Sequence, residues 1–547
     1  MSEKSKLSEI KKALNEAGVE CKSKEVLTTS GIPVKSLYTP LDTEALDYFA
    51  DLGLPGGPPF TRGVYQEMYR RQLWSQRQVC GYGTAEETNE RLRFLNKQGQ
   101  TGLNIVPDTP TIYGLDSDNT LSDGEVGREG VAIDTLSDMR NLLAGLELDK
   151  VSTSIIYNYP ILFCMYLAVA QERGIPVESL SGTLQNDPFT ITAGAKSWIV
   201  PPKGSLKLCV DVIEFCTKSM PRFNPVSVVG YHYREAGCTA VQEVGFTLAA
   251  GLSYIRAGVD RGLEVDAFAP RLSFFYNAHN DFFEEIAKYR AARRLWYRLV
   301  SEKFKPNNPR SCMLRFHTQT AGSSLTAQQP LNNIMRTTVQ ALAAILGGTQ
   351  SLHTNSYDEA LSIPSAEAAK ISLRTQQVLA LESGVTNTAD PLAGSYFVES
   401  LTGEIENRAR SLVEKIEEMG GMLAAVENNF VQTEITLEAH REQMETDKGS
   451  RKVVGVNCFA EPQEEISFEI MRVPPELEKK QIERLNKVRR ERDAEKTEKA
   501  LANLEKVASQ GQNTIEATME AVKVGATVGE IGALYRKVFG TYQDPGL

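Results

Sequence analysis

The sequence predicts an α/β protein: a closed (β/α)8 TIM barrel with an N-terminal arm and a helical C-terminal extension. Between residues 61 and 400, about eight short strand-like runs alternate with longer amphipathic helical patterns. Strands and helices that alternate in one uninterrupted run favour a barrel over a doubly wound sheet. The alternation is absent from residues 1–60 and stops after residue 400, which sets the arm and the extension apart from the barrel.

Each element has its own signal in the chain. The arm, residues 1–60, combines a short helical pattern with extended sequence that contains Pro and Gly. The clearest helix covers residues 280–304, where Asn280 or Asp281 can cap the first turn and a regular series of apolar residues forms one face. Strands are expected at residues 77–81, 102–106, 151–157, 182–185, 226–232, 272–276, 312–320 and 349–355.

Beyond the barrel, residues 401–474 are predicted to be Glu-rich helices and a linker, and residues 475–547 a helical tail. The tail begins with a long charged helix over 474–508, whose mixed charges suit pairing between residues four apart. Two short amphipathic helices joined at Gly525 follow. A charged helix is most often solvated surface, but beside an apolar helix pair it also suits a docking platform for another chain. Both interpretations stay open.

The composition excludes several classes of protein. The net charge is −10 and basic residues are mixed with acidic ones, so nucleic acid is not an expected partner. The N-terminus is charged and lacks an apolar signal core, and no apolar run reaches bilayer length, so we expect a cytoplasmic protein with no membrane partner. The eight cysteines are scattered, which favours buried reduced thiols over a zinc site.

Small polar residues occupy strand positions where a barrel normally has bulky branched ones. A barrel lined by hydroxyl groups is not plugged by its own side chains and has room for a polar ligand along its axis. The residues concerned are Ser152, Ser154, Thr183, Gln185, Ser227, Thr349 and Ser351. Further polar side chains are expected at the carboxyl ends of strands, the catalytic face of such barrels: Tyr231, His232, Arg271, Ser273, His317, Gln319, His353 and Asn355.

Long motifs carry a family resemblance. The segments "RFHTQTAGSSLTAQQP", "NNIMRT", "GGTQSLHTNSYDEAL", "LRTQQVLALESGV" and "DPLAGSYFVE" resemble the methylmalonyl-CoA mutase family of adenosylcobalamin-dependent acyl-CoA mutases. The similarity runs almost continuously from about residue 41 to 460, and the tail resembles the end of the separate large subunits of this family. Within the family, "SDGEVGREGVAIDTLSDMR" looks like the 2-hydroxyisobutyryl-CoA and isobutyryl-CoA mutase branch.

The resemblance implies an isomerase that rearranges the carbon skeleton of an acyl-CoA by a radical 1,2-shift, with adenosylcobalamin as cofactor. Coenzyme A then runs along the barrel axis, and the acyl group lies at the carboxyl-end mouth beneath the cobalamin. The cobalamin-binding signature D-x-H-x-x-G is absent, because none of the five histidines has the required Asp and Gly. We therefore expect a large subunit without a metal ligand of its own. It would bind cobalamin jointly with a separate small subunit docked on the tail, as a heterotetramer, with a G-protein chaperone as a further possible partner.

The resemblance also assigns residues. His232 matches the histidine that hydrogen-bonds the thioester carbonyl, and Tyr231 beside it is the second expected catalytic residue. The acyl pocket is expected at Val79, Val106, Ala195 and Gln185. The cofactor-facing positions are Pro107, Glu235, Gln319, Glu359 and Ala360. The coenzyme A channel is matched by Tyr65, Met68, Ser75, Arg77, Ser154, Thr183, Asn224, Arg271, Ser273 and Ser351.

Departures from the family pattern concern the acyl group. Val79 and Ala195 replace the Tyr and Arg that hold the carboxylate of methylmalonyl-CoA, and a buried carboxylate without a partner costs several kcal/mol. Lys196 is adjacent and could compensate. The isobutyryl enzymes typically have Phe and Gln at these two places, and the 2-hydroxyisobutyryl enzymes have Ile at the first. Val106 stands where the hydroxyacyl enzymes carry an Asp for the substrate hydroxyl.

These changes predict an enlarged, apolar pocket for a branched or bulky uncharged acyl group: 2-hydroxyisobutyryl-, pivalyl/isovaleryl- or isobutyryl-like. Other replacements lie near the corrin and coenzyme A: Pro107, Ile112, Gln72 and Ser323. They leave two alternatives open, a catalytically idle homologue that acts as a scaffold or regulator, and a barrel enzyme that uses CoA thioesters without cobalamin.

Overall fold

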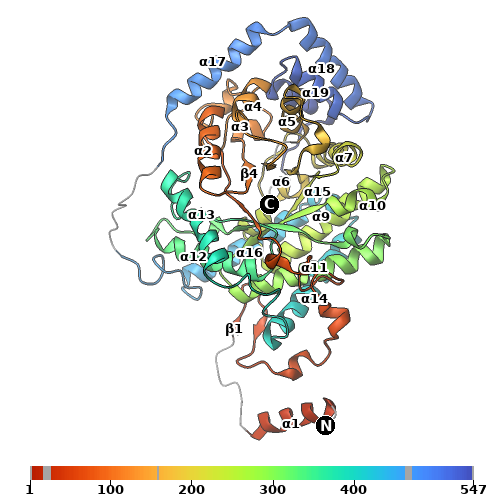
Figure 1. Ribbon diagram of the computed structural model, residues 1–547, viewed down its shortest axis with the longest axis vertical. Coiled ribbons are helices and arrows are strands. Elements are labelled where there is room, and N and C mark those ends of the chain that lie inside the picture. The colour runs from red at the N-terminus through yellow and green to blue at the C-terminus, as the bar shows by residue number, and fades with distance from the viewer. Residues whose placement is uncertain (1–2, 17–25, 157–158, 462–470, 545–547) are drawn as a thin grey trace.

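The protein is built on eight parallel strand positions that surround one axis (Figure 1). The structure, a computed structural model, describes residues 3–16, 26–156, 159–461 and 471–544. One sheet has the order β3 (Ser75–Arg77), β11 (Ser351–His353), β10 (Phe316–Thr320), β9 (Ser273–Ala278) and β8 (Ser227–Val229). The other has the order β4 (Gly102–Ile105), β5 (Ser152–Ile156), β6 (Gly182–Gln185) and β7 (Phe223–Asn224).

The two sheets meet at two seams. At the first, Cys80 N donates to Asn104 O at 2.9 Å and Val106 N donates to Cys80 O at 3.1 Å, which joins the end of β3 to β4. At the second, β7 continues into β8 after an interruption at Pro225 and Val226. Proline has no N–H for the ladder, which explains the break. The predicted (β/α)8 fold is confirmed by its eight parallel strand positions, although the strands form two sheets and not one closed ladder. Each expected strand region overlaps a strand, the first at Arg77 only, and Tyr157 lies outside the described residues.

Helices cover the outside of the barrel. They are α2 (Ala85–Lys97), α4 (Leu136–Leu142), α5 (Pro160–Glu172), α7 (Pro202–Ser219), α9 (Ala240–Asp260), α11 (Phe282–Phe304), α12 (Asn332–Leu346) and α13 (Ala366–Leu381). Most are amphipathic, whereas α5 is apolar all round and buried along most of its length. Asp281 caps α11, as expected, by accepting a hydrogen bond from Glu284 N. The structure contains no helix, within the described ranges, that is long and apolar enough to cross a membrane. Its described cysteines are unpaired and, apart from Cys458, buried.

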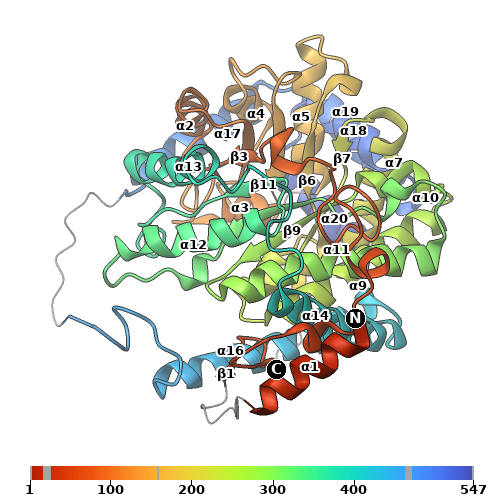
Figure 2. The ribbon, with the colours of Figure 1, turned by 60° about the horizontal axis from the view of Figure 1, so that its bottom comes forward.

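The arm and the helices after the barrel lie together on one side of it (Figure 2). Residues 26–60 pass along α11, α14 (Tyr396–Glu418) and α16 (Phe430–Asp447). Ser30 N donates to Glu284 Oε1 on α11 at 3.0 Å, and Arg441 on α16 donates to Thr29 O at 3.1 Å. The arm preceding Phe60 is therefore part of the packed body from residue 26 onward.

The tail forms four helices: α17 (Pro475–Glu491), α18 (Ala494–Ser509), α19 (Ile515–Lys523) and α20 (Val528–Phe539). The prediction of a single long helix over 474–508 is wrong, because the helix is interrupted at Arg492 and Asp493. Asp493 caps α18 through Lys496 N, and the Arg492 guanidinium turns away to pair with Glu530 at 2.6 Å. The two short helices joined at Gly525, which has a positive φ of 92°, are confirmed.

The tail packs on the barrel with its apolar side. Ile515 and Val522 of α19 and Tyr535 of α20 are fully buried in one core with α5 and α7. Arg489 of α17 pairs with Asp116 at 2.7 Å, in the segment that follows β4 at the mouth of the barrel. The faces that remain exposed are mainly the charged sides of α17 and α18.

Candidate active site

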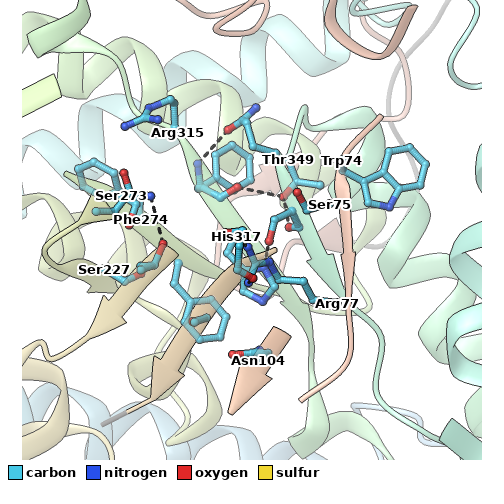
Figure 3. Close-up of a pocket in the computed structure, with 18 of the residues that line it drawn as sticks. Trp74, Ser75, Arg77, Asn104, Ser227, Ser273, Phe274, Arg315, His317 and Thr349 are labelled. Carbon is cyan, nitrogen blue, oxygen red and sulfur yellow. Dashed lines mark hydrogen bonds between the residues drawn. The ribbon is translucent and has the colours of Figure 1, made fainter. Parts of the chain in front are cut away.

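A cavity of about 260 Å³ runs along the barrel axis (Figure 3). The small polar residues predicted to leave the axis open do line it, which confirms that expectation: Ser152, Ser154, Thr183, Gln185, Ser227, Thr349 and Ser351. Of the residues matched to the coenzyme A channel, all but Arg271 also lie in its wall.

Strand register explains why these side chains meet. Residues paired on neighbouring parallel strands point to the same side of the sheet. Asn104, Ser154, Thr183 and Asn224 are paired in turn across β4, β5, β6 and β7 and form one polar layer of the wall. On the other sheet, Ser227 pairs with Ser273, and His317 pairs with Ser351 and Ser351 with Ser75. The wall is thus built of short side chains at matched heights.

Most polar atoms of this wall are satisfied by the protein. The Arg77 guanidinium donates to Ser152 Oγ and Leu103 O, each at 2.7 Å, and burial lowers the Arg77 pKa to about 10. His317 Nδ1 bonds with the Ser351 hydroxyl, whereas His317 Nε2 is buried without a hydrogen-bond partner in the described structure. The axis therefore offers a polar surface with one guanidinium, Arg77, and with open polar atoms at His317 Nε2, Asn104 Oδ1 and Asn224 Oδ1 among the described residues.

Arginines gather at the amino end of the barrel. Burial, together with the charges of Arg315, Arg310 and Arg222, lowers the pKa of Arg271. Arg315 lines the cavity entrance with Tyr65, which is 46% exposed, and no carboxylate of the described chain pairs with Arg271 or Arg315. Arginines without acidic partners at the opening of a cavity suit phosphate groups. The prediction that Arg271 and Ser273 lie at the carboxyl end is wrong, because both precede or start β9.

A second cavity, of about 450 Å³, opens at the carboxyl end. It brings together Val79 and Val106, predicted for the acyl pocket, and Gln319, Glu359 and Ala360, predicted to face the cofactor. His353 lies in the same wall, and its Nδ1 accepts a hydrogen bond from Val79 N at 3.1 Å. Ala195 and Pro107 do not line either of these cavities, as far as the described residues show.

His232 and Tyr231 lie between the two cavities, in α8 (Tyr231–Glu235), which begins as soon as β8 ends. His232 Nε2 is 3.0 Å from Gln185 Nε2, at the upper end of the axis. Burial lowers the His232 pKa to about 3, so the ring is neutral at physiological pH. The Tyr231 ring stacks on Phe275 with 4.8 Å between centroids, and its hydroxyl accepts from Gln319 Nε2 at 2.8 Å.

Glu359 lines the mouth, and Glu235, which lines neither cavity, lies close enough for its charge to act on Glu359. Burial raises the Glu235 pKa to about 7, while hydrogen bonds from Ser323 and Asn277 oppose that rise. Burial and the charges of Glu235 and Asp358 raise the Glu359 pKa to about 7 as well. The mouth therefore changes its charge near neutral pH, in contrast to His232.

The loop after α6 (Pro188–Ala193) shows where Lys196 lies, the residue that could replace the missing Arg as a partner for an acyl carboxylate. Gly194 approaches His232 so closely that an added Cβ would lie 3.0 Å from the His232 carbonyl carbon. Ala195 follows it with a methyl group only. Lys196 extends away to Asp544 of the tail, with 2.5 Å between the charged atoms. Its ammonium group, which is about half exposed, forms a surface ion pair with the tail and not a contact in the mouth.

Several lining residues escaped the sequence analysis. Asn104, Phe275 and Arg315 line the axis, and Tyr82, Arg91 and Glu129 line the mouth. Asn104 and Phe275 had a usable signal, because each occupies a strand position paired with a predicted lining residue or its neighbour. Arg91 is on the outer helix α2, and no periodicity in the chain shows that its side chain reaches the mouth.

Comparisons with known proteins agree with this geometry. The family model described as methylmalonyl-CoA mutase matches residues 27–541. The 2-hydroxyisobutanoyl-CoA mutase large subunit of Aquincola tertiaricarbonis is 44% identical over 97% of this chain and 96% of its own length. Methylmalonyl-CoA mutase of Cereibacter sphaeroides is 44% identical over 94% of this chain and 73% of its own length, and the human mitochondrial enzyme is 43% identical over 94% and 69%.

Proposed function

Because the chain belongs to the methylmalonyl-CoA mutase family, whose members are carbon-skeleton isomerases, we propose that it rearranges a branched or bulky uncharged acyl-CoA as the large subunit of an adenosylcobalamin-dependent mutase. The observation that carries the substrate class is the wall of the mouth, where Val79 and Val106 present only aliphatic side chains. The 2-hydroxyisobutyryl, pivalyl/isovaleryl and isobutyryl groups all fit this description.

The axis suits coenzyme A. A long, narrow, uncharged chain with amide groups matches a channel lined by hydroxyls and amides, and the phosphates of a nucleotide match the arginines at its amino end. A ligand placed this way carries its thioester to the level of Gln185 and His232. The acyl group then lies against Val79 and Val106 at the start of the mouth.

The residues of the mouth fit the adenosyl group of the cofactor. Asn355 Nδ2 is buried without a hydrogen-bond partner in the described chain. Gly322 leaves open the space in front of it, where a Cβ would lie 3.1 Å from both Asn355 Nδ2 and Glu235 Oε2. A free donor beside a carboxylate oxygen matches the hydroxyl groups of a ribose. Adenosylcobalamin, when bound here, supplies the radical that starts the rearrangement, and Glu235, Gln319, Glu359 and Asn355 are the side chains that would hold it.

His232 is assigned to the thioester carbonyl. A neutral imidazole N–H can donate to the carbonyl oxygen and stabilise negative charge that develops there, without giving up its proton. The low pKa keeps the ring neutral, and the Gln185 amide nitrogen, a donor 3.0 Å from His232 Nε2, makes Nε2 the acceptor and leaves the ring N–H on Nδ1. The stack of Tyr231 on Phe275 closes the site beside the imidazole and keeps water from the acyl group.

The positions expected to meet the acyl group offer the carboxylate of methylmalonyl-CoA no partner, and the cation in the wall of this mouth, Arg91, donates to Pro364 O. Val79 and Ala195 cannot form an ion pair, and Lys196 is paired with Asp544. Val106 likewise gives a substrate hydroxyl no acceptor at the position predicted for one. These three positions favour acyl groups whose recognition depends on shape.

A small cobalamin-binding subunit is the proposed partner, and the name of the Aquincola relative contains the words "large subunit". The tail reaches the mouth, where Tyr542 O accepts from Trp198 Nε1 at 3.0 Å and Asp544 pairs with Lys196. A subunit that rests on the exposed sides of α17 and α18 would contact the same rim that holds His232.

The test is turnover by the chain together with its cognate small subunit and adenosylcobalamin, across methylmalonyl-, isobutyryl-, 2-hydroxyisobutyryl-, isovaleryl- and pivalyl-CoA. We expect a higher kcat/KM for at least one uncharged acyl-CoA than for methylmalonyl-CoA. Preference for methylmalonyl-CoA would refute the substrate class. Binding of every thioester without turnover of any of them would support an idle homologue.

A further inference from the structure

Behind the mouth, a cluster of charged residues is sealed inside the protein where α9 and α11 pack against β9. Lys288 of α11 pairs with Glu243 of α9 at 2.6 Å and with Glu285, and all three side chains are fully buried. Arg234 lies near the same two carboxylates. Burial lowers its pKa, but the negative charges of Glu285 and Glu243 raise it, and the net pKa is raised. A buried ion pair seldom stabilises a fold more than apolar packing does, so what the cluster orients is the informative question.

The cluster holds the main chain of Asn277. Asn277 N donates to Glu243 Oε1 at 2.7 Å, and Asn277 O accepts from Lys288 Nζ at 2.8 Å and from the Tyr289 hydroxyl at 2.5 Å. The neighbouring strand β8 ends at Val229, before it can supply an acceptor for Asn277 N, and the Glu243 carboxylate takes that place. Side chains thus hold strand β9 at the point where its hydrogen-bond ladder with β8 ends.

Gly230 makes this arrangement possible. A Cβ added there would lie 2.5 Å from Thr247 Oγ1 and 2.8 Å from Glu243 Cγ. The missing side chain lets α9 approach the end of β8 and bring Glu243 to the main chain of Asn277.

The side chain of Asn277 points from this anchored backbone to the mouth. Its Nδ2 donates to Glu235 Oε1 at 2.5 Å, and Asn277 itself has no exposed surface. Ser323 N donates to the other carboxylate oxygen of Glu235 at 2.8 Å. Glu235 is therefore held from two elements, the end of β9 and the turn after β10.

We propose that Asn277 is a positioning residue for the mutase reaction: its amide orients the Glu235 carboxylate at the mouth, and the Lys288–Glu243–Glu285 cluster orients Asn277. This inference rests on the proposed function for the meaning of Glu235, which faces the cofactor there. Its structural part, the control of Glu235 by Asn277, concerns this chain alone. The other groups that face Glu235 are Arg234 on its own helix, Glu359 across the mouth and the Tyr231 phenol.

The amide also sets the charge of Glu235. A hydrogen bond donated to a carboxylate favours the ionised form, so removal of the Asn277 amide raises the Glu235 pKa above its present value of about 7. The ionised fraction at neutral pH then falls. Glu359 is coupled to Glu235 through its charge, so its own pKa falls when the ionised fraction of Glu235 falls.

The experiment follows the protonation of Glu235 by infrared spectroscopy of the chain without cofactor or substrate. The difference between wild type and Glu235→Gln isolates the Glu235 carboxyl band, and its pH midpoint is measured. In Asn277→Leu, which has a similar volume and no donor, we expect the midpoint to move up by about one pH unit, a tenfold change. Asn277→Ser, whose hydroxyl is too short to reach Glu235, is expected to give the same direction and serves if the first variant does not fold.

The matched control is Tyr289→Phe, which removes a hydrogen bond to Asn277 O but leaves the amide on Glu235, and its midpoint is expected to stay. An unchanged midpoint in both Asn277 variants, or an equal shift in Tyr289→Phe, would overturn the inference. In the complete enzyme, the acid limb of kcat/KM is expected to move with Asn277→Leu and not to move further in the Glu235→Gln background. Because the titration needs no turnover, it is informative even for a chain that proves inactive on every acyl-CoA.

Discussion

The two ends of the barrel are built on opposite principles. The amino end and axis are lined by hydroxyl, amide and aromatic side chains with Arg77 in the wall, beneath a group of arginines without acidic partners among the described residues. The mouth carries carboxylates, Glu235 and Glu359, whose pKa values lie near neutrality, and aliphatic residues where the family holds charged acyl groups. The difference indicates that the coenzyme A part of the substrate and its acyl group are recognised separately, with His232 between the two cavities.

This division explains how one scaffold can serve several acyl groups. The polar layers of the axis depend on register across many strands, so a change there disturbs the channel as a whole. The acyl group meets a few side chains at strand ends and in loops, such as Val79 and Val106, which can change without altering the strand ladder.

The largest effect is expected at His232, between the axis cavity and the mouth. His232→Ala removes the donor assigned to the thioester carbonyl, and we expect kcat to fall by about 100- to 1000-fold. The affinity for free coenzyme A should stay within about threefold, because the axis is untouched. Steady-state kinetics with the small subunit and calorimetry with coenzyme A measure the two quantities. A comparable loss of coenzyme A affinity would show that the axis and the reacting site are not separate.

The amino end should respond in the opposite way. Arg315→Ala removes a cation at the cavity entrance, and we expect coenzyme A affinity to fall about tenfold with kcat nearly unchanged. Acyl-pantetheine, which lacks the nucleotide, should bind wild type and variant alike. Arg315→Lys, which keeps the charge, is the matched control. An effect on acyl-pantetheine as large as that on coenzyme A would contradict the assignment of this end to phosphate.

A smaller change is expected at the mouth. Val106→Asp introduces an acceptor for a substrate hydroxyl, and we expect the ratio of kcat/KM for 2-hydroxyisobutyryl-CoA over isobutyryl-CoA to rise about fivefold, the worth of roughly one hydrogen bond. Val106→Leu changes the volume without adding an acceptor and should not raise the ratio. Equal responses of the two variants would mean that Val106 does not face the acyl group.

Much of the fold was predictable from the sequence, because strands and helices alternate with clear periodicity and Asp281 marks the start of α11. The hydroxyl lining was predictable for the same reason, since Ser154 and Thr183 violate the usual barrel pattern. It was harder to predict at which end of a strand a residue lies. Arg271 is at the amino end because β9 starts two residues after it, and composition does not mark that boundary. The break at Arg492 depends on its contact with Glu530, distant in the chain.

The site required both kinds of information. His232, Glu235 and Glu359 came from the family resemblance, and their pKa values and partners came from packing that no pattern reveals. Asn277 was missed because its importance depends on Lys288 and Glu243, which belong to other elements.

The central claim, that Val79, Val106 and Ala195 give an acyl carboxylate no partner, is tested most directly by comparing methylmalonyl-CoA with isobutyryl-CoA, in which a methyl group replaces the carboxylate. Dissociation constants of the two thioesters for the chain alone can be measured by calorimetry. We expect isobutyryl-CoA to bind at least about tenfold more tightly, because Val79 and Ala195 leave the carboxylate unpaired and Lys196 is held by Asp544. Equal affinity, or tighter binding of methylmalonyl-CoA, would contradict the account.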